Sequence, residues 1–193
     1  MSPPDRSDDE AALLIRTRDG DESAFVSLYR RHRDSLYRFS LRMLGSPAEA
    51  EDVTHDCLAS LLQRPEGFDS AKASLRAYLF GVARHLMWKR LRRSSSQESL
   101  EDSRGDGVPD SRLGPLAILV RQETGEEVAA AMAALTPPQR EALVLFEYEG
   151  LSLAEIAALA EVDVGTVSAR LHRARNGLRK RLAHLADVGT RRP

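Results

Sequence analysis

The side chains best suited to chemistry in this chain are cations spaced along a helical pattern near its C-terminus. Residues 164–182 place an apolar side chain at every third or fourth position, which is typical of an amphipathic helix. Between these positions lie the basic residues Arg170, Arg173, Arg175, Arg179, Lys180 and Arg181. Guanidinium and ammonium groups bind phosphates and the edges of guanine bases. The pattern therefore predicts a helix that can lie in a DNA major groove.

A shorter helix is expected immediately before this one. Ser152 and Glu155 have the spacing of a capping box, in which a hydroxyl and a carboxylate satisfy the unpaired amides of a helix start. Asp163 is placed to cap the following helix. These signals predict a helix-turn-helix over residues 151–182. The pattern alone is also compatible with an ordinary helical hairpin that has a solvated basic face.

The composition narrows the class of protein. The 193 residues allow one large domain or two small ones, and a hydrophobic content of 42% suffices for packed cores. No run of about 18 apolar residues is present, and the acidic N-terminus does not resemble a secretory signal. The single cysteine, Cys57, excludes an internal disulfide and a cysteine-rich metal site. We therefore expect a protein of a reducing cytoplasm that has no cofactor.

The charge of the chain is unevenly distributed. The formal net charge is −1, yet residues 84–93 carry basic side chains and no acid, whereas residues 97–127 are mainly acidic. A protein that gripped DNA over its whole surface would be strongly basic. Two basic segments separated by an acidic one therefore predict two DNA-contacting surfaces and weak DNA binding by the chain alone.

Helical periodicity dominates the sequence and strand patterns are almost absent, so we predict an all-α fold with two small helical domains. The first domain, residues 8–93, holds helices expected over 8–18, 21–45, 47–64 and 70–93. The apolar side of the last helix is expected at Leu75, Leu79, Val82, Leu86 and Leu91. Residues 94–115 lack a hydrophobic period and predict a flexible acidic linker. The second domain, residues 116–187, contains a helix over 123–135, a helix from Thr136 to Gly150 with Leu143, Val144 and Phe146 buried, and the helix-turn-helix.

Three stretches of the chain resemble the extracytoplasmic-function group of bacterial RNA polymerase sigma factors. Residues 49–56 (EAEDVTHD) are similar to the acidic motif of that family, and residues 75–93 resemble its helix that reads the −10 element. Residues 135–141 together with 165–175 resemble its domain that reads the −35 element. The resemblance implies a two-domain sigma factor that binds core RNA polymerase and directs promoter recognition and transcription initiation.

In this family the acidic helix docks on a coiled coil of the largest polymerase subunit. The resemblance carries that role to Glu49, Glu51, Asp52, Val53, Asp56 and Leu58. Acids in the first turn of a helix also favour its dipole, and for Glu49 this role is as strong a candidate as the partner. Asp52 and Asp56 lie one turn apart, and the dipole explains them less well.

The resemblance also implies that residues 75–93 capture a single DNA strand as the duplex opens. The resemblance assigns this contact to Arg84, His85, Trp88, Lys89, Arg92 and Arg93. The cations among them would bind the phosphates, and the loop 63–74 would form the pocket for a flipped base. Two roles stay open for Trp88, which either stacks on a base or anchors the helix to the core. The family usually has asparagine and aspartate where this chain has His85 and Lys89, so the −10 preference of the family does not carry over.

For the −35 element the resemblance assigns contacts with intact duplex. The residues are Thr166, Ser168, Ala169, Arg170, His172 and Arg173, with His172 facing either DNA or solvent. Ser168 stands where a basic residue is frequent in the family. Glu161 stands where the family often has glycine, which would cost up to about 1 kcal/mol if the backbone there is left-handed.

Other classes of function explain fewer of these features. A self-sufficient transcriptional regulator also carries a helix-turn-helix, but it needs no acidic docking helix and usually dimerises. A helical adaptor would not explain two basic segments. An enzyme is disfavoured because five histidines and one cysteine show no metal-ligand spacing, and no phosphate-binding glycine loop or nucleophile elbow is present.

We therefore expect a sigma factor without catalytic residues, acting in the bacterial cytoplasm. The partners implied by the resemblance are core RNA polymerase, promoter DNA as a −35 duplex and a −10 single strand, and a separate anti-sigma factor. Contact with a membrane is expected only through that anti-sigma partner. Because little chain follows the helix-turn-helix, no fused sensor domain is expected.

Overall fold

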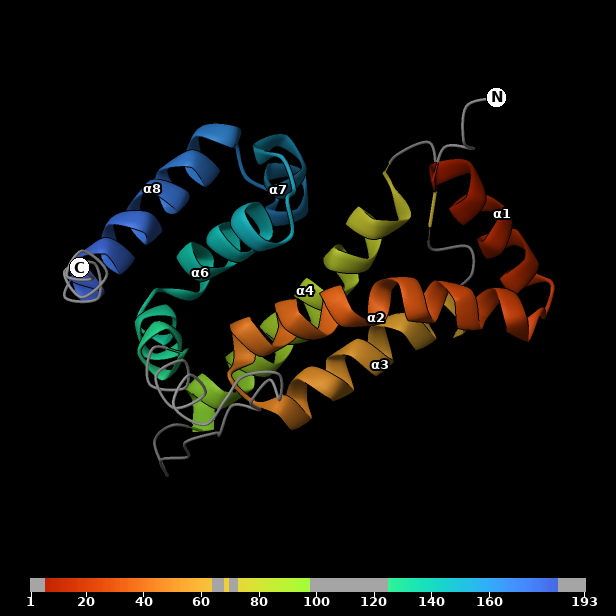
Figure 1. The fold of residues 1–193 in the computed structure, drawn as a ribbon, viewed down its shortest axis with the longest axis horizontal. Coiled ribbons are helices and arrows are strands. Elements are labelled where there is room, and N and C mark those ends of the chain that lie inside the picture. Colours follow the sequence, from red (N-terminus) through yellow and green to blue (C-terminus); the bar gives the residue numbers. More distant parts are fainter. Residues whose placement is uncertain (1–5, 64–67, 70–72, 98–124, 184–193) are drawn as a thin grey trace, which may run out of the picture. The chain divides into compact units, whose positions relative to one another are not determined.

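A computed structural model describes residues 6–63, 68–69, 73–97 and 125–183 of the chain (Figure 1). The secondary-structure elements within these residues are helices, which confirms the predicted all-α class. The helices fall into two compact units. Much of the predicted linker lies outside the described residues, as do residues 116–124 and 184–187 of the predicted second domain.

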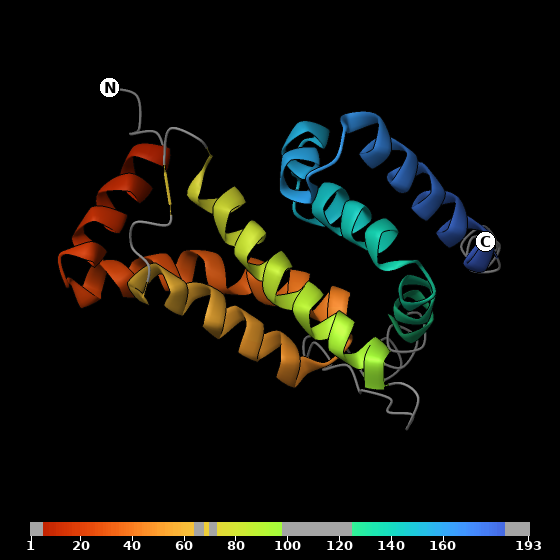
Figure 2. The same ribbon diagram turned by 180° about the vertical axis from the view of Figure 1, so that it is seen from behind.

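The first unit contains four helices: α1 (Arg6–Arg18), α2 (Glu22–Leu44), α3 (Pro47–Gln63) and α4 (Leu75–Gln97). Helices α1 and α4 both contact α2, and Figures 1 and 2 show α4 crossing it. The core between α2, α3 and α4 is apolar, and its buried side chains include Leu28, Leu36, Phe39, Met43, Val53, Cys57, Leu58, Leu79, Phe80 and Met87. The rings of Phe39 and Phe80 meet edge to face at 5.3 Å.

Local capping chemistry sets the ends of these helices as the sequence predicts. The Asp21 carboxylate accepts hydrogen bonds from the amides of Ser23 and Ala24 and so caps α2. The side-chain hydrogen bond from Ser23, together with Arg16, holds the pKa of Asp21 well below its usual range. Gly45 ends α2 with a left-handed φ of 74°, and Pro47 is the first residue of α3.

Helix α4 differs from its prediction at both ends and in its buried side. It begins at Leu75, where the Ser74 hydroxyl accepts a hydrogen bond from the Ala77 amide, and it continues past Arg93 to Gln97. The predicted positions Val82, Leu86 and Leu91 are only half-buried, whereas Leu75, Leu79, Phe80, Ala83 and Met87 are buried. Apolar residues occur on more than one side of this helix. Phe80 packs against Phe39 of α2, and Met87 is fully buried.

The buried Cys57 thiol donates to the carbonyl oxygen of Leu79, at an Sγ–O distance of 3.2 Å. Burial raises the pKa of this thiol to about 12, so Cys57 is a core residue that joins α3 to α4. His55, two residues earlier, is exposed on another face of the same helix.

The second unit contains a helical segment over 125–133, then α6 (Pro137–Leu143), η2 (Val144–Tyr148), α7 (Leu153–Ala160) and α8 (Val164–Arg181). Helix α8 packs against α6 and α7. The buried residues here include Leu135, Leu143, Val144, Leu145, Leu151, Ile156, Val167, Leu171 and Ala174.

The wide turn η2 changes which residues face the core at the end of the predicted helix 136–150. Its π-helical geometry buries Leu145 and leaves Phe146 half-buried, although the sequence pattern predicted a buried Phe146. The turn then ends at Gly150 (φ 66°), and the Leu151 amide donates to the Leu145 carbonyl. The Arg140 guanidinium connects α6 to the end of the preceding helical segment, because it donates hydrogen bonds to the carbonyl oxygens of Met132, Ala133 and Leu135.

Candidate functional site

The acidic residues of α3 are exposed, while Val53, Cys57, Leu58 and Leu61 on its inner face are buried. Side chains of Asp52 and Asp56 are 72% and 54% exposed, and Glu49 and Glu51 also lie at the surface. Val53 and Leu58 are fully buried and cannot offer an apolar contact to a partner, which corrects the role assigned to them from the sequence. They share the inner face of α3 with Cys57 and Leu61, at the spacing of one helical stripe.

Arginines of the neighbouring helices contact this acidic surface from two sides. Arg33 of α2 lies 3.2 Å from a carboxylate oxygen of Glu51. From α4, the Arg90 Nη2 atom lies 3.4 Å from Asp56 Oδ2 and 4.0 Å from Asp52 Oδ2. Arg90 belongs to the basic segment of residues 84–93, so one cation of that segment faces α3.

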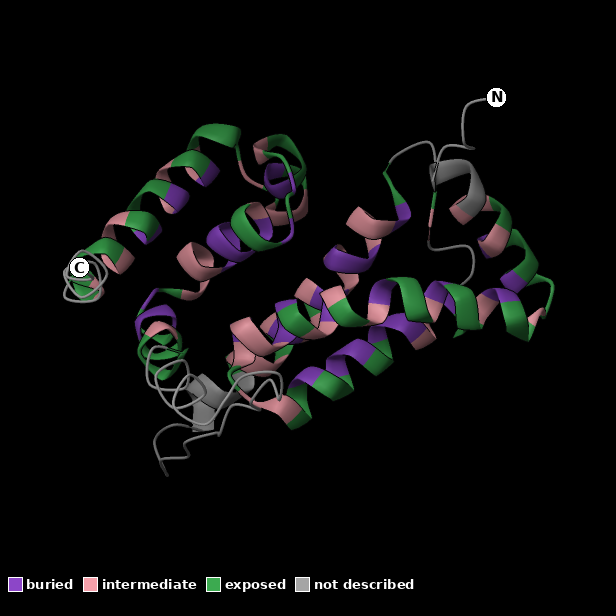
Figure 3. Ribbon diagram, viewed as in Figure 1, coloured by how far each residue is buried: buried purple, intermediate pink, exposed green. Residues whose placement is uncertain are grey.

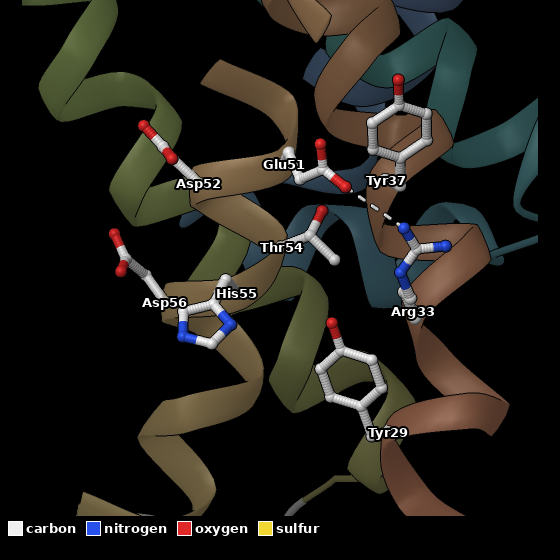
Figure 4. A pocket seen from close by; sticks show the side chains of 8 residues that line it. All are labelled: Tyr29, Arg33, Tyr37, Glu51, Asp52, Thr54, His55 and Asp56. Carbon is white, nitrogen blue, oxygen red and sulfur yellow. Dashed lines mark hydrogen bonds and ion pairs between the residues drawn. The ribbon is translucent and has the colours of Figure 1, made fainter. Parts of the chain in front are cut away.

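A surface hollow of about 320 Å³ lies between α2 and α3 (Figure 4). Its lining residues are Tyr29, Arg33, Tyr37, Glu51, Asp52, Thr54, His55 and Asp56. Figure 4 shows Glu51 directed toward Arg33, while Asp52 and Asp56 point away from Arg33. The α2 residues of this hollow were not predicted from the sequence. The available signal was the i, i+4, i+8 spacing of Tyr29, Arg33 and Tyr37, which places the three side chains on one face of a helix.

On α4, the exposed residues predicted to bind the −10 strand lie along one stretch of helix. His85, Lys89 and Arg92 are exposed, while the side chain of Arg93 lies outside the described part. The Arg84 guanidinium carbon is 5.8 Å from the centre of the half-buried Trp88 ring. Trp88 is therefore held against Arg84, and part of its surface stays accessible.

Most of the predicted base-binding loop 63–74 is outside the described residues. Within it, the Phe68 ring packs against Tyr78 of α4 with centroids 5.4 Å apart. The Arg18 guanidinium of α1 donates to the Phe68 carbonyl oxygen at 3.2 Å. These contacts tie one point of the loop to two helices.

The helix-turn-helix forms as its capping residues predict. The Glu155 amide donates to the Ser152 hydroxyl at 3.2 Å, and the Ser152 amide donates to the Glu155 carboxylate at 2.8 Å. Asp163 accepts from the amide and the hydroxyl of Thr166, at 2.7 and 2.6 Å, and these bonds lower the pKa of Asp163. Glu161 has a left-handed backbone (φ 54°, ψ 44°), so it carries the cost of up to about 1 kcal/mol that glycine would avoid.

Helix α8 separates a buried face from an exposed one (Figure 3). Val167, Leu171 and Ala174 are buried, and the residues predicted to read the −35 element are on other faces. Ser168, His172 and Arg173 are exposed, whereas Thr166, Ala169 and Arg170 are partly exposed. Among the described residues, Arg170 and Arg173 make no ion pair.

Two further polar residues of α8 are engaged with other side chains. Arg175 donates from Nε to Glu147 at 2.8 Å and lies over the Phe146 ring, so it joins α8 to η2. The Nε2 atom of His172 lies 2.8 Å from the side-chain nitrogen Nδ2 of Asn176, one turn later. His172 is exposed, and solvent or a ligand can reach its ring.

Within the described residues, no group of three or more histidine, cysteine or acidic side chains is arranged to hold a metal ion. The helices described there also include none that is long and apolar enough to cross a membrane. The clusters that remain are the acidic surface of α3 and the exposed cations of α4 and α8.

Comparisons with known proteins match both units. Residues 28–97 match the model of sigma-70 region 2, and residues 125–178 match that of sigma-70 region 4. The ECF RNA polymerase sigma factor SigE of Mycolicibacterium smegmatis is 31% identical over 182 residues, covering 92% of this chain and 70% of that protein. The chain belongs to the ECF RNA polymerase sigma factors. ECF sigma factor SigL of Mycobacterium tuberculosis is 32% identical over 168 residues, which cover 82% of this chain and 89% of SigL.

Solved structures share the fold of this ECF sigma factor. The sigma factor RpoE in complex with the anti-sigma factor NepR, from Bartonella quintana, superposes with a TM-score of 0.70 at 23% identity, over 82% of this chain and 96% of that one. CnrH in complex with the cytosolic domain of CnrY gives a TM-score of 0.62 at 26% identity, over 93% and 97%. The region 2 match ends at residue 97, which is also the last residue of α4. As a sigma factor, the protein belongs to a family of transcription regulators that direct RNA polymerase to promoters.

Proposed function

We propose that this sigma factor docks on core RNA polymerase through the acidic surface of α3. The residues that make the contact are Glu49, Glu51, Asp52 and Asp56, whose exposure on one helix supports the proposal. The hollow beside them extends the surface onto α2. Tyr29 and Tyr37 there offer aromatic rings beside carboxylates, a setting that favours an arginine or lysine of the partner. Val53 and Leu58 hold α3 in the core and make no contact with polymerase.

We infer that α4 captures the single −10 strand. His85, Lys89 and Arg92 support this role by their exposure along the helix, and Arg93 follows them in the sequence. Arg84 and Trp88 of the same helix form a cation–π pair. Cations bind the phosphates of a single strand, and an aromatic surface stacks on its bases. In this proposal, Trp88 both anchors α4 and presents part of its ring to DNA.

We infer that α8 reads the −35 duplex from the major groove, with Arg170 and Arg173 as its principal cations. The other contacts are Thr166, Ser168, Ala169 and His172. The Thr166 hydroxyl donates a hydrogen bond to Asp163, so toward DNA this side chain acts as an acceptor or through its methyl group. We assign the two readers to domains 8–97 and 116–187, with the acidic linker over 98–115, because α4 continues to Gln97.

We further propose that an anti-sigma factor controls this protein and covers the docking surface on α3. RpoE of similar fold was solved with the anti-sigma factor NepR, which supports a partner of this kind. The protein has no catalytic residue of its own in this proposal and acts in the bacterial cytoplasm, where core polymerase is found. It contacts a membrane only through an anti-sigma partner.

The exposed acidic surface of α3 is the observation that carries the proposed docking. A photoreactive amino acid in place of His55, which lines the hollow, is expected to cross-link to the largest subunit of core polymerase. The same probe in place of Ser27, on another face of α2, serves as the matched control and is expected to give little cross-linking. Equal cross-linking from both positions, or from Ser27 alone, would place the interface elsewhere.

A further inference from the structure

Arg90 occupies part of the surface that the proposed docking requires. Its Nη1 atom donates to the backbone carbonyl oxygen of Glu49 at 2.9 Å, across from α4 to α3. Its Nη2 atom lies near two carboxylates, 3.4 Å from Asp56 and 4.0 Å from Asp52. The Arg90 side chain is 24% exposed, so its guanidinium is more enclosed than either carboxylate. One cation of this chain thus neutralises part of the charge of two docking acids.

The two sets of contacts made by Arg90 differ in strength. The bond to the Glu49 carbonyl has the length of a good hydrogen bond and positions the guanidinium. The ion pairs to Asp56 and Asp52 are longer, and their carboxylates are exposed to solvent and salt. A cation of a partner can therefore approach the two carboxylates from solvent and replace the weak pairs, while Arg90 stays anchored on Glu49.

We propose that Arg90 is an internal counter-ion of the docking surface, which competes with cations of core polymerase for Asp52 and Asp56. The inference rests on the proposed docking at those two residues. Arg90 limits the affinity for polymerase, since each docking event must weaken ion pairs that already exist in the sigma factor. The same competition disfavours partners whose surface is less basic than the polymerase site.

The test measures binding of the full-length protein to core polymerase, without DNA, as a function of salt. We expect Arg90→Gln to bind about 2- to 5-fold more tightly at low salt, the range expected for loss of one exposed ion pair, and expect the gain to shrink as salt screens the carboxylates. Arg38→Gln removes the same charge from an exposed position of α2 that has no ion pair among the described residues. This control is expected to change the affinity much less.

Two further variants separate the possible outcomes. In an Asp52→Asn, Asp56→Asn background, Arg90→Gln is expected to give no gain, because the carboxylates for which it competes are absent. If Arg90→Gln alters the far-ultraviolet circular dichroism, Arg90→Lys replaces it: lysine keeps the charge but loses the forked geometry of the guanidinium, and tighter binding than that of the unsubstituted protein is still expected. Affinity that is unchanged or reduced in a folded Arg90 variant overturns the inference. Failure of Asp52→Asn, Asp56→Asn to weaken binding would instead refute the proposed docking itself.

Discussion

Replacing Asp52 and Asp56 together by lysine is expected to weaken binding to core polymerase by at least about tenfold, through lost attraction and new repulsion at the docking surface. Both side chains are more than half exposed, so direct damage to the core is small. Binding is measured with labelled sigma factor and purified core polymerase. Unchanged affinity would mean that the docking surface lies elsewhere.

The contact with Arg90 calls for a control in this experiment. Two lysines beside Arg90 replace an ion-paired cluster by three neighbouring cations, so the double variant also loses stability within the first unit. A triple variant that adds Arg90→Glu restores opposite charges between α3 and α4 but keeps the docking surface basic. We expect the triple variant to regain thermal stability and to remain defective in polymerase binding. Recovery of both properties together would mean that the original defect came from folding.

Substitutions in α8 and in α4 are expected to impair different steps of transcription initiation. Arg173→Ala should weaken recognition of the −35 duplex by roughly 1–3 kcal/mol, the cost of one lost phosphate or guanine contact. Arg173 is exposed on α8 without an ion pair among the described residues, so its loss leaves the fold intact. Initiation by the Arg173→Ala holoenzyme on a template already melted at −10 should be unaffected. Lys180→Ala, at the exposed end of the same helix, is the matched control and is expected to have a small effect.

The converse defect is expected from α4. Arg84→Ala should slow promoter opening and leave −35 occupancy mostly unchanged. Because Arg84 also lies against Trp88, its removal loosens that ring as well. Lys89→Ala, which removes an exposed cation, is therefore the cleaner probe of phosphate contact. If α4 and α8 variants gave the same defect on duplex and pre-melted templates, the assignment of two separate readers would be wrong.

Features governed by local chemistry could be predicted from the sequence. The caps formed by Asp21, Asp163 and the Ser152–Glu155 pair depend on residues only two or three positions apart. The left-handed turn at Gly45 is equally local. Each of these signals satisfies backbone groups within a single helix end, so no tertiary information is needed to read it.

Features governed by packing between helices could not be predicted in the same way. The resemblance assigned Val53 and Leu58 to an interface, but both are buried in the core because their side of α3 faces α2 and α4. The buried side of α4 depends on which apolar stripe best fits its neighbours. Arg90 belongs to the basic segment of residues 84–93 and carried no predicted partner in the protein, yet its partner Glu49 lies 41 positions earlier in the chain. Such a contact appears only when the helices are placed together.

Promoter recognition by this protein is expected to require the sigma factor and core polymerase together. The most direct measurement is equilibrium binding to duplex promoter DNA at physiological salt, by the purified chain alone and after its assembly with core polymerase. The net charge of −1 and the few exposed cations of α4 and α8 predict weak, salt-sensitive binding by the chain alone and tight, sequence-specific binding by the assembly. Tight sequence-specific binding by the chain alone would contradict this account and favour a self-sufficient regulator.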